Sequence, residues 1–148
     1  MRVFETADKN EITDEFKSAK SFENSWANGA CMLLRLEMIQ EIGMFDENMR
    51  FLFSDSDYSF TARSRGWQVR VATNAFIDHS LSGSAAQSNP ALDVFKLEDQ
   101  LYFSQKWLSG DIYRKLSHKG DKLTPEFVKA TMSETQENLD YFRELFKK

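Results

Sequence analysis

The sequence predicts an α/β fold in which a small mixed sheet is flanked by helices and followed by a helical C-terminal region. Two stretches, residues 28–35 and 68–77, have the apolar runs and loose alternation that are typical of strands. Between them an acidic cluster precedes a segment with the pattern of a helix. From residue 91 onward, apolar residues recur at helical spacing.

Length and composition favour one soluble domain of 148 residues, with a core in residues 1–90 and C-terminal helices in residues 91–148. The net charge of −4 argues against nucleic acid as a partner, because nucleic-acid binding requires a basic surface. Cys31, the single cysteine, fits a reducing compartment. No apolar run reaches the roughly 18 residues of a transmembrane segment. We therefore expect a cytoplasmic protein, and peripheral association with a membrane stays open.

The first 27 residues carry weak signals, a short strand over residues 1–6 and a brief helix starting near Thr13. A strand over Asn28–Arg35 is predicted next, with small residues first and an apolar run after them. Leu36–Ile42 has the pattern of a helix, and Gly43 is placed to end it.

The acidic cluster comes before the central helix, which we expect to be capped by Ser54 or Asp55 and to end at Gly66. Asp55 and Asp57 then lie in the first turn, where the helix dipole favours negative charge. Capping alone accounts for these aspartates as well as a functional role does, so both interpretations stay open.

A strand over Gln68–Ile77 follows the central helix and ends at the pair Asp78 and His79. The small and polar residues 80–90 predict a loop, either beside an active site or as a plain connection. Two helices complete the chain: one over Ala91–Leu108, and a long amphipathic one starting at Thr124 and Pro125.

The order of these motifs resembles the C-terminal half of a family 2, GT-A type glycosyltransferase of the rhamnosyltransferase-like branch. The matching pieces are NGACMLLR, IGMFDE, an acidic triplet that opens a helix, R-x-x-GW, a strand and a histidine. Each piece alone is weak, and their order and spacing carry the resemblance, which covers the central third to half of the chain.

The resemblance implies an inverting, metal-dependent transfer of a sugar from a nucleotide-sugar to a hydroxyl of a sugar or lipid-linked acceptor. Matched position by position, it implies Asp55 as the catalytic base. It also implies that Asp46, Glu47 and Asp57 shape the acceptor side. His79 matches the histidine that completes a site for Mn²⁺ or Mg²⁺ in many members. Asp55 and His79 should then face one cleft, about 5–12 Å apart.

Two departures limit what the resemblance implies. Ser54 stands where the acidic triplet normally has a glutamate, so one acceptor contact is lost. The nucleotide-binding half of the family, with its Asp-x-Asp motif, has no counterpart before Asn28. Gln105-Lys106-Trp107 is only a faint echo of the Gln-x-x-Arg-Trp motif of processive relatives, so a single-addition enzyme is the better analogue.

The missing half leaves three situations open: a fragment of a larger enzyme, one half of a split enzyme whose donor half is another chain, or an inactive relative. We expect little or no transfer by this chain alone, and a donor-half chain or a homo-oligomer as its partner. The alternative function is a non-catalytic interaction module whose phenylalanine-rich C-terminal helices bind a partner. A metal-dependent hydrolase using Asp55, Asp57 and His79 is disfavoured because their spacing matches no known ligand set.

Overall fold

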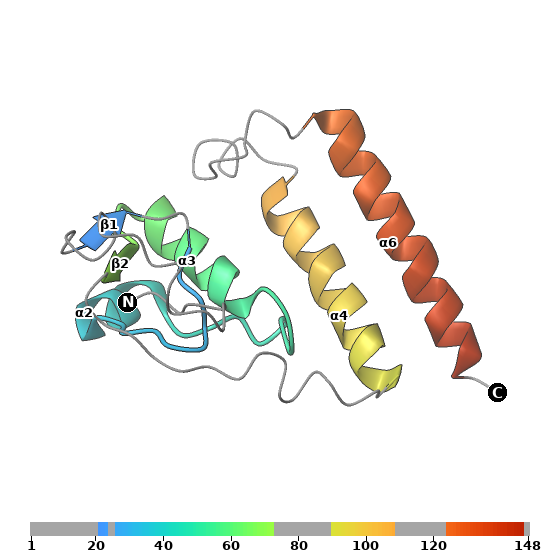
Figure 1. Ribbon diagram of the computed structural model, residues 1–148, viewed down its shortest axis with the longest axis horizontal. Coiled ribbons are helices and arrows are strands. Elements are labelled where there is room, and N and C mark those ends of the chain that lie inside the picture. The colour runs from blue at the N-terminus through green and yellow to red at the C-terminus, as the bar shows by residue number, and fades with distance from the viewer. Residues whose placement is uncertain (1–20, 24–25, 73–89, 109–123, 147–148) are drawn as a thin grey trace, which may run out of the picture.

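The structure is a computed structural model that describes residues 21–23, 26–72, 90–108 and 124–146. Helices prevail in these ranges, and α3 lies between the strand pair with α2 on one side and α4 on the other (Figure 1). The elements are β1 (Ser21–Glu23), α2 (Leu36–Ile42), α3 (Ser54–Ser64), β2 (Arg70–Ala72), α4 (Pro90–Phe103), the π-helical turn η2 (Ser104–Leu108) and α6 (Pro125–Leu145).

The strands β1 and β2 form a two-stranded antiparallel pair, with Phe22 opposite Val71. In the described ranges this pair is the whole sheet. The mixed, GT-A-like sheet expected from the sequence is therefore not confirmed, whereas the helical C-terminal region is.

The strand predicted over Asn28–Arg35 is wrong for the described chain. Residues 29–31 form a turn and a bend, and residues 32–35 have no regular secondary structure. A strand needs a partner for its backbone groups, and in the described chain no hydrogen bond involves the backbone of residues 32–34. The strand predicted over Gln68–Ile77 starts two residues later than predicted, because β2 spans Arg70–Ala72. The described range stops at residue 72, so the predicted end lies outside it.

Two helix ends that carry a local sequence signal lie where the sequence predicts them. Helix α2 spans the predicted residues, and Gly43 ends it with a φ of 85° that favours glycine. Helix α6 begins as predicted, because the Thr124 side chain accepts a hydrogen bond from the Phe127 amide and Pro125 occupies the first turn.

The predicted cap of α3 is wrong, although the helix itself is confirmed. Phe53, with a left-handed φ of 64°, occupies the N-cap position and makes no side-chain cap. The turn before it is fixed from a distance by Asp99 of α4. This fully buried carboxylate accepts the backbone amides of Arg50 at 3.1 Å, Phe51 at 2.6 Å and Leu52 at 2.7 Å. A tertiary contact thus decides how the chain enters α3.

Helix α3 has a packed cluster on each side. Phe60 meets Phe103 and Trp107 of the C-terminal helices, whereas Tyr58 and Ala62 meet Met38 of α2. This placement makes α3 the central element of the described fold.

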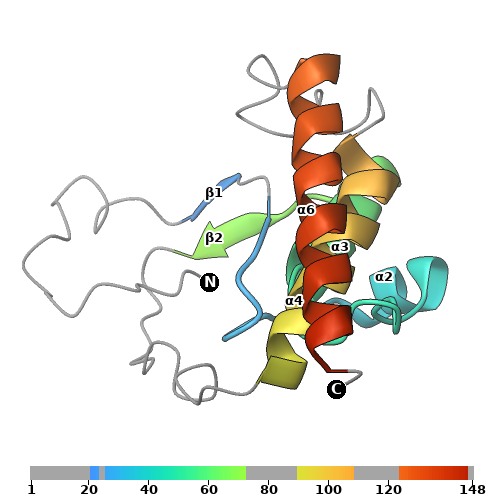
Figure 2. The ribbon, with the colours of Figure 1, turned by 90° about the vertical axis from the view of Figure 1, so that its right-hand side faces the viewer.

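Helices α4 and α6 run antiparallel beside each other (Figures 1 and 2). Leu139 of α6 is 1% exposed, and Gln100 donates to the Thr135 hydroxyl at 3.1 Å. The Glu98 carboxylate pairs with Arg50 of the turn before α3 and, at 2.7 Å, with Arg143 of α6. Apolar contact and these polar links together attach α6 to the rest of the fold.

Several predicted elements lie outside the described residues: the strand over residues 1–6, the helix near Thr13 and all but the last residue of the loop over residues 80–90. None of the helices in the described ranges combines the length and the apolar character needed to cross a membrane.

Candidate functional site

Asp55 lies in the first turn of α3 with its carboxylate held by two neighbours. One oxygen accepts the Gly29 amide at 2.8 Å, and the other accepts the Ser56 amide at 2.7 Å. The side chain is half-buried, so its carboxylate has a fixed orientation while part of it stays open to solvent.

Gly29 can approach Asp55 closely because it has no side chain. A methyl group built on Gly29 would lie 3.3 Å from the Cβ of Asp55, which is tighter than ordinary van der Waals contact. The Ser59 hydroxyl adds a second tie, since it accepts the Ala27 amide at 3.1 Å and donates to the Asp55 backbone oxygen at 2.7 Å. Residues 27–29 therefore set the position of Asp55.

Asp57 is buried, at 2% exposed, and its environment is polar. One carboxylate oxygen accepts the Trp107 indole N–H at 2.7 Å and contacts the Lys106 Nζ at 2.8 Å. Both partners come from η2, so the π-helical turn delivers two consecutive side chains to the same oxygen. Turns of this kind occur often at functional sites.

Asp46, in the loop before α3, shares the cation of Lys106. Its Oδ2 accepts Lys106 at 2.8 Å and the Tyr102 hydroxyl at 3.0 Å, and its Oδ1 accepts the Asn48 side-chain amide at 2.8 Å. Lys106 thus bridges two of the carboxylates that the sequence assigns to the acceptor side. We call Asp46, Asp57, Tyr102, Lys106 and Trp107 the lysine bridge.

The charges of the lysine bridge stabilise one another. The hydrogen bond from Lys106 holds the pKa of Asp46 well below its ordinary value. Burial disfavours the charge on Lys106, but its hydrogen bonds to the two carboxylates outweigh this and raise its pKa. The hydrogen bond to Asp46 likewise raises the pKa of Tyr102. At neutral pH the bridge therefore holds a lysine cation and the Asp46 anion.

The remaining predicted site residues are not brought into the lysine bridge. Glu47 is exposed, and within the described chain no hydrogen bond or ion pair joins it to Asp46 or Asp57. His79 lies outside the described residues, so its distance from Asp55 stays a prediction.

Sequence reasoning missed Ser59, Tyr102, Lys106 and Asp99, the side chains that position the predicted aspartates. Lys106 lies in the Gln105-Lys106-Trp107 stretch, whose only signal is its faint similarity to the Gln-x-x-Arg-Trp motif. Asp99 had a signal too, since a carboxylate at an apolar-side position of a helix is unusual without a buried partner.

The described residues do not supply a metal site. Among them no three histidine, cysteine or acidic side chains converge closely enough to hold an ion. Asp46 and Asp57 are already paired with Lys106, so a divalent cation would have to displace that lysine.

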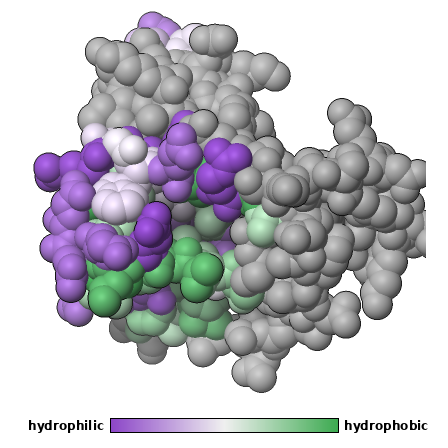
Figure 3. Space-filling view, turned by 90° about the vertical axis from the view of Figure 1, so that its left-hand side faces the viewer, coloured by the Kyte–Doolittle hydropathy of each residue, from purple (hydrophilic) through white to green (hydrophobic). Residues whose placement is uncertain are grey.

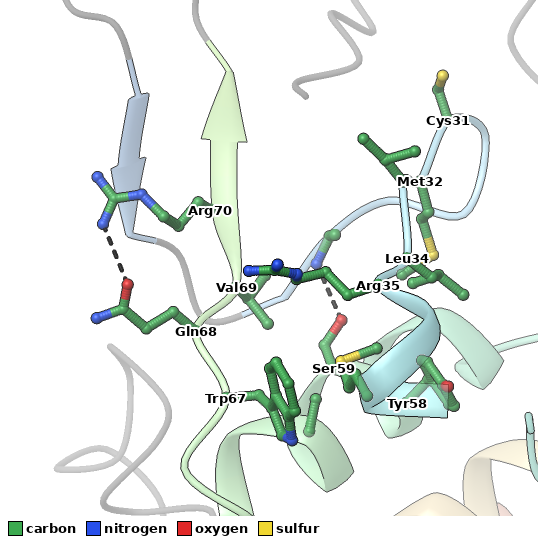
Figure 4. A pocket seen from close by; sticks show the side chains of 14 residues that line it. Cys31, Met32, Leu34, Arg35, Tyr58, Ser59, Trp67, Gln68, Val69 and Arg70 are labelled. Atoms are coloured by element: carbon green, nitrogen blue, oxygen red, sulfur yellow. Dashed lines mark hydrogen bonds between the residues drawn. The ribbon is translucent and has the colours of Figure 1, made fainter. Parts of the chain in front are cut away.

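A cavity of about 120 Å³, lined in part by Ser59, lies between β2 and the segment that leads into α2. Figure 4 shows Met32 and Leu34 across the cavity from Val69, with Trp67 on the same side as Val69. On this face of the molecule hydrophobic residues gather in a patch bordered by hydrophilic ones (Figure 3). The lining is mainly apolar, and the side chains of Arg35, Gln68 and Arg70 add charged and polar groups to it.

Comparisons with protein-family models, with curated proteins and with solved structures found no match to this chain. The interpretation of the site therefore depends on its residues and their geometry.

Proposed function

We propose that this chain is the acceptor-side half of an inverting glycosyltransferase, with Asp55 as the catalytic base. The observation that carries the proposal is the carboxylate of Asp55, which is half-buried, fixed by the amides of Gly29 and Ser56, and still open to solvent. A general base needs this combination of fixed orientation and access to substrate.

In the proposed reaction, Asp55 accepts the proton of an acceptor hydroxyl as the hydroxyl oxygen attacks the anomeric carbon of the donor sugar. The new carbon–oxygen bond forms as the bond to the nucleoside diphosphate breaks, and the diphosphate leaves with the electron pair. A divalent cation, Mn²⁺ or Mg²⁺, would stabilise the charge on that leaving group, and the donor-binding half together with His79 would hold it.

The lysine bridge supports Asp55 indirectly. Because Lys106 pairs with both Asp46 and Asp57, its cation offsets part of the negative charge that these two carboxylates bring to the surroundings of Asp55. We therefore assign Asp57 to holding α3 against η2, and leave Asp46, at the partly exposed end of the bridge, as the carboxylate that can contact the acceptor.

A non-catalytic interaction module is the second candidate, and one observation favours it. Helix α6 exposes large hydrophobic side chains at both ends, which a partner could cover. They are Phe127, Tyr141, Leu145 and Phe146. In this function Asp55 only caps α3.

The test compares the purified chain with the complete or reconstituted enzyme. The chain alone, given a UDP- or dTDP-sugar with Mn²⁺, should give negligible turnover, whereas robust transfer would contradict the absence of a donor site. In the complete enzyme, Asp55→Asn should lower kcat by about 100-fold or more and leave donor binding intact. Asp93→Asn, which changes a partly exposed carboxylate of α4 outside the proposed site, is the matched control. Unchanged turnover of Asp55→Asn would remove Asp55 from the mechanism and favour the interaction module.

A further inference from the structure

The cavity between β2 and the segment that leads into α2 has the size and the wall of a site for a small molecule. Its volume is about 120 Å³, and an apolar protein cavity of about 150 Å³ binds one benzene molecule. The buried side chains of Met38, Ala62 and Val69 form part of the wall. Such a wall gives water few hydrogen bonds, so an apolar group displaces water from it readily.

The polar atoms of three other wall residues already have partners in the protein. The Tyr58 hydroxyl donates to the Gly43 backbone oxygen at 2.8 Å, and the Trp67 indole N–H donates to the Glu41 carboxylate at 3.0 Å. The Ser59 hydroxyl has one donor and one acceptor in the backbone. Because these atoms need no further partner, the wall favours an apolar ligand body over a polar one.

The charged residues that line the cavity are both cationic. Arg35 extends from the start of α2 toward β2 (Figure 4), and Arg70 of β2 is the other. No aspartate or glutamate is among the lining residues. Arg35 has an acidic neighbour, Glu37, at 3.7 Å, but these two side chains are 76% and 68% exposed, so the pair is weak. The cavity therefore attracts an anion, although the chain carries a net charge of −4.

We propose that this cavity binds a small organic carboxylate, with its apolar part inside and its carboxylate paired with the Arg35 guanidinium. The volume limits the apolar part to about one benzene ring. A guanidinium is planar and presents paired N–H donors, which match the two oxygens of a carboxylate. Because Arg35 is exposed, the head group stays in contact with water and no charge is buried. The binding is independent of the role of Asp55.

Benzoate is the probe, since its ring fits the volume and it carries a single negative charge. NMR of the ¹⁵N-labelled chain follows a titration to about 20 mM, because a ligand of this size should bind with a dissociation constant on the order of 1 mM. The shifts should concentrate on Ala62, Val69 and the Trp67 indole. Benzyl alcohol, which has the ring without the charge, should bind about 3-fold more weakly or worse. Acetate, which has the charge without the ring, should leave these signals unshifted.

Two variants separate the interior of the cavity from its charged side. Ala62→Leu adds three carbon atoms to the buried wall and should abolish the benzoate shifts. Arg35→Gln should weaken benzoate about 3-fold or more and leave benzyl alcohol unchanged. Arg65→Gln is the matched control, because Arg65 is exposed and does not line the cavity. Circular dichroism checks that each variant is folded, and the exposed Arg35→Gln provides the test if Ala62→Leu is not.

Three results would overturn the proposal. Benzoate could leave the cavity signals unshifted, as it would if another part of the chain already filled the space. Benzyl alcohol could bind as tightly as benzoate, or Arg65→Gln could weaken benzoate as much as Arg35→Gln does. None of these results bears on Asp55, whose role is tested by turnover of Asp55→Asn.

Discussion

At the residue scale, Lys106 supplies a cation to the buried carboxylate of Asp57. Its Nζ lies 2.8 Å from an oxygen of this carboxylate and 2.8 Å from an oxygen of Asp46. The pairing explains how a carboxylate at 2% exposed is tolerated inside the fold.

Lys106→Met should therefore lower the free energy of unfolding by about 2–4 kcal/mol, because it leaves a buried carboxylate without its cation. Urea unfolding at pH 7 measures the change. Lys96→Met is the matched control, since Lys96 pairs with Asp93 near the surface and should cost at most about 1 kcal/mol. Equal losses in the two variants would mean that the lysine bridge adds nothing to stability.

The same bridge predicts a dependence on pH. The pKa of Asp46 is lower in the folded protein than in the unfolded chain, so its contribution to stability is complete above the ordinary carboxyl range and is lost as pH falls through that range toward its folded pKa. Unfolding measured from pH 7 to pH 3 should show a shallower loss of stability for Asp46→Asn than for the wild type. Glu47→Gln, which removes the exposed neighbouring carboxylate, should follow the wild-type curve.

At the element scale, the entry into α3 depends on a helix that comes almost fifty residues later. Asp99 of α4 accepts three backbone amides of the turn that precedes α3. The left-handed Phe53 follows that turn directly, so α4 holds the backbone that delivers Asp55.

Asp99→Asn should lower the free energy of unfolding by about 2 kcal/mol, because the amide NH₂ cannot accept the hydrogen bonds that one carboxylate oxygen accepts. Hydrogen exchange at the amides of Phe51 and Leu52 should speed up more than exchange elsewhere in the fold. Asp93→Asn, in the same helix and partly exposed, is the control. Unaltered protection at both amides would contradict the role given to Asp99.

The sequence predicted those features that have local causes. Helices α2 and α6 were correct because Gly43, Thr124 and Pro125 act through their own backbone. The cap of α3 was wrong because Asp99 fixes the preceding turn from a distance. The strand predicted over residues 28–35 was wrong in the described chain. A strand needs a second strand for its backbone hydrogen bonds, and the residue pattern within one segment does not show whether that second strand is present.

In the site, too, the sequence does not reveal those features that have distant causes. The resemblance assigned Asp46 and Asp57 to the acceptor side, and the structure shows Lys106 in contact with both carboxylates. Nothing in the sequence around these two aspartates indicates that both are paired with a lysine from η2. Positioning residues such as Ser59 and Asp99 act through contacts far along the chain, and spacing alone does not reveal them.

At the scale of the whole molecule, the described chain is a helical unit with a short strand pair, an unpaired apolar segment and a fixed carboxylate at the start of its central helix. These features fit the acceptor half of a transferase that is completed by other chain segments. The proposed function further requires Asp55 and His79 to face one cleft, although they belong to different elements of the sequence.

The most direct test of that requirement is an NMR titration of the two histidines, His79 and His118, in the wild type and in Asp55→Asn. A nearby carboxylate stabilises the protonated imidazole, so removing it should lower the pKa of His79 and leave that of His118 unchanged. Asp93→Asn should alter neither. If the pKa of His79 stays the same in a folded Asp55→Asn protein, the two side chains do not share a cleft and the proposed catalytic site is wrong.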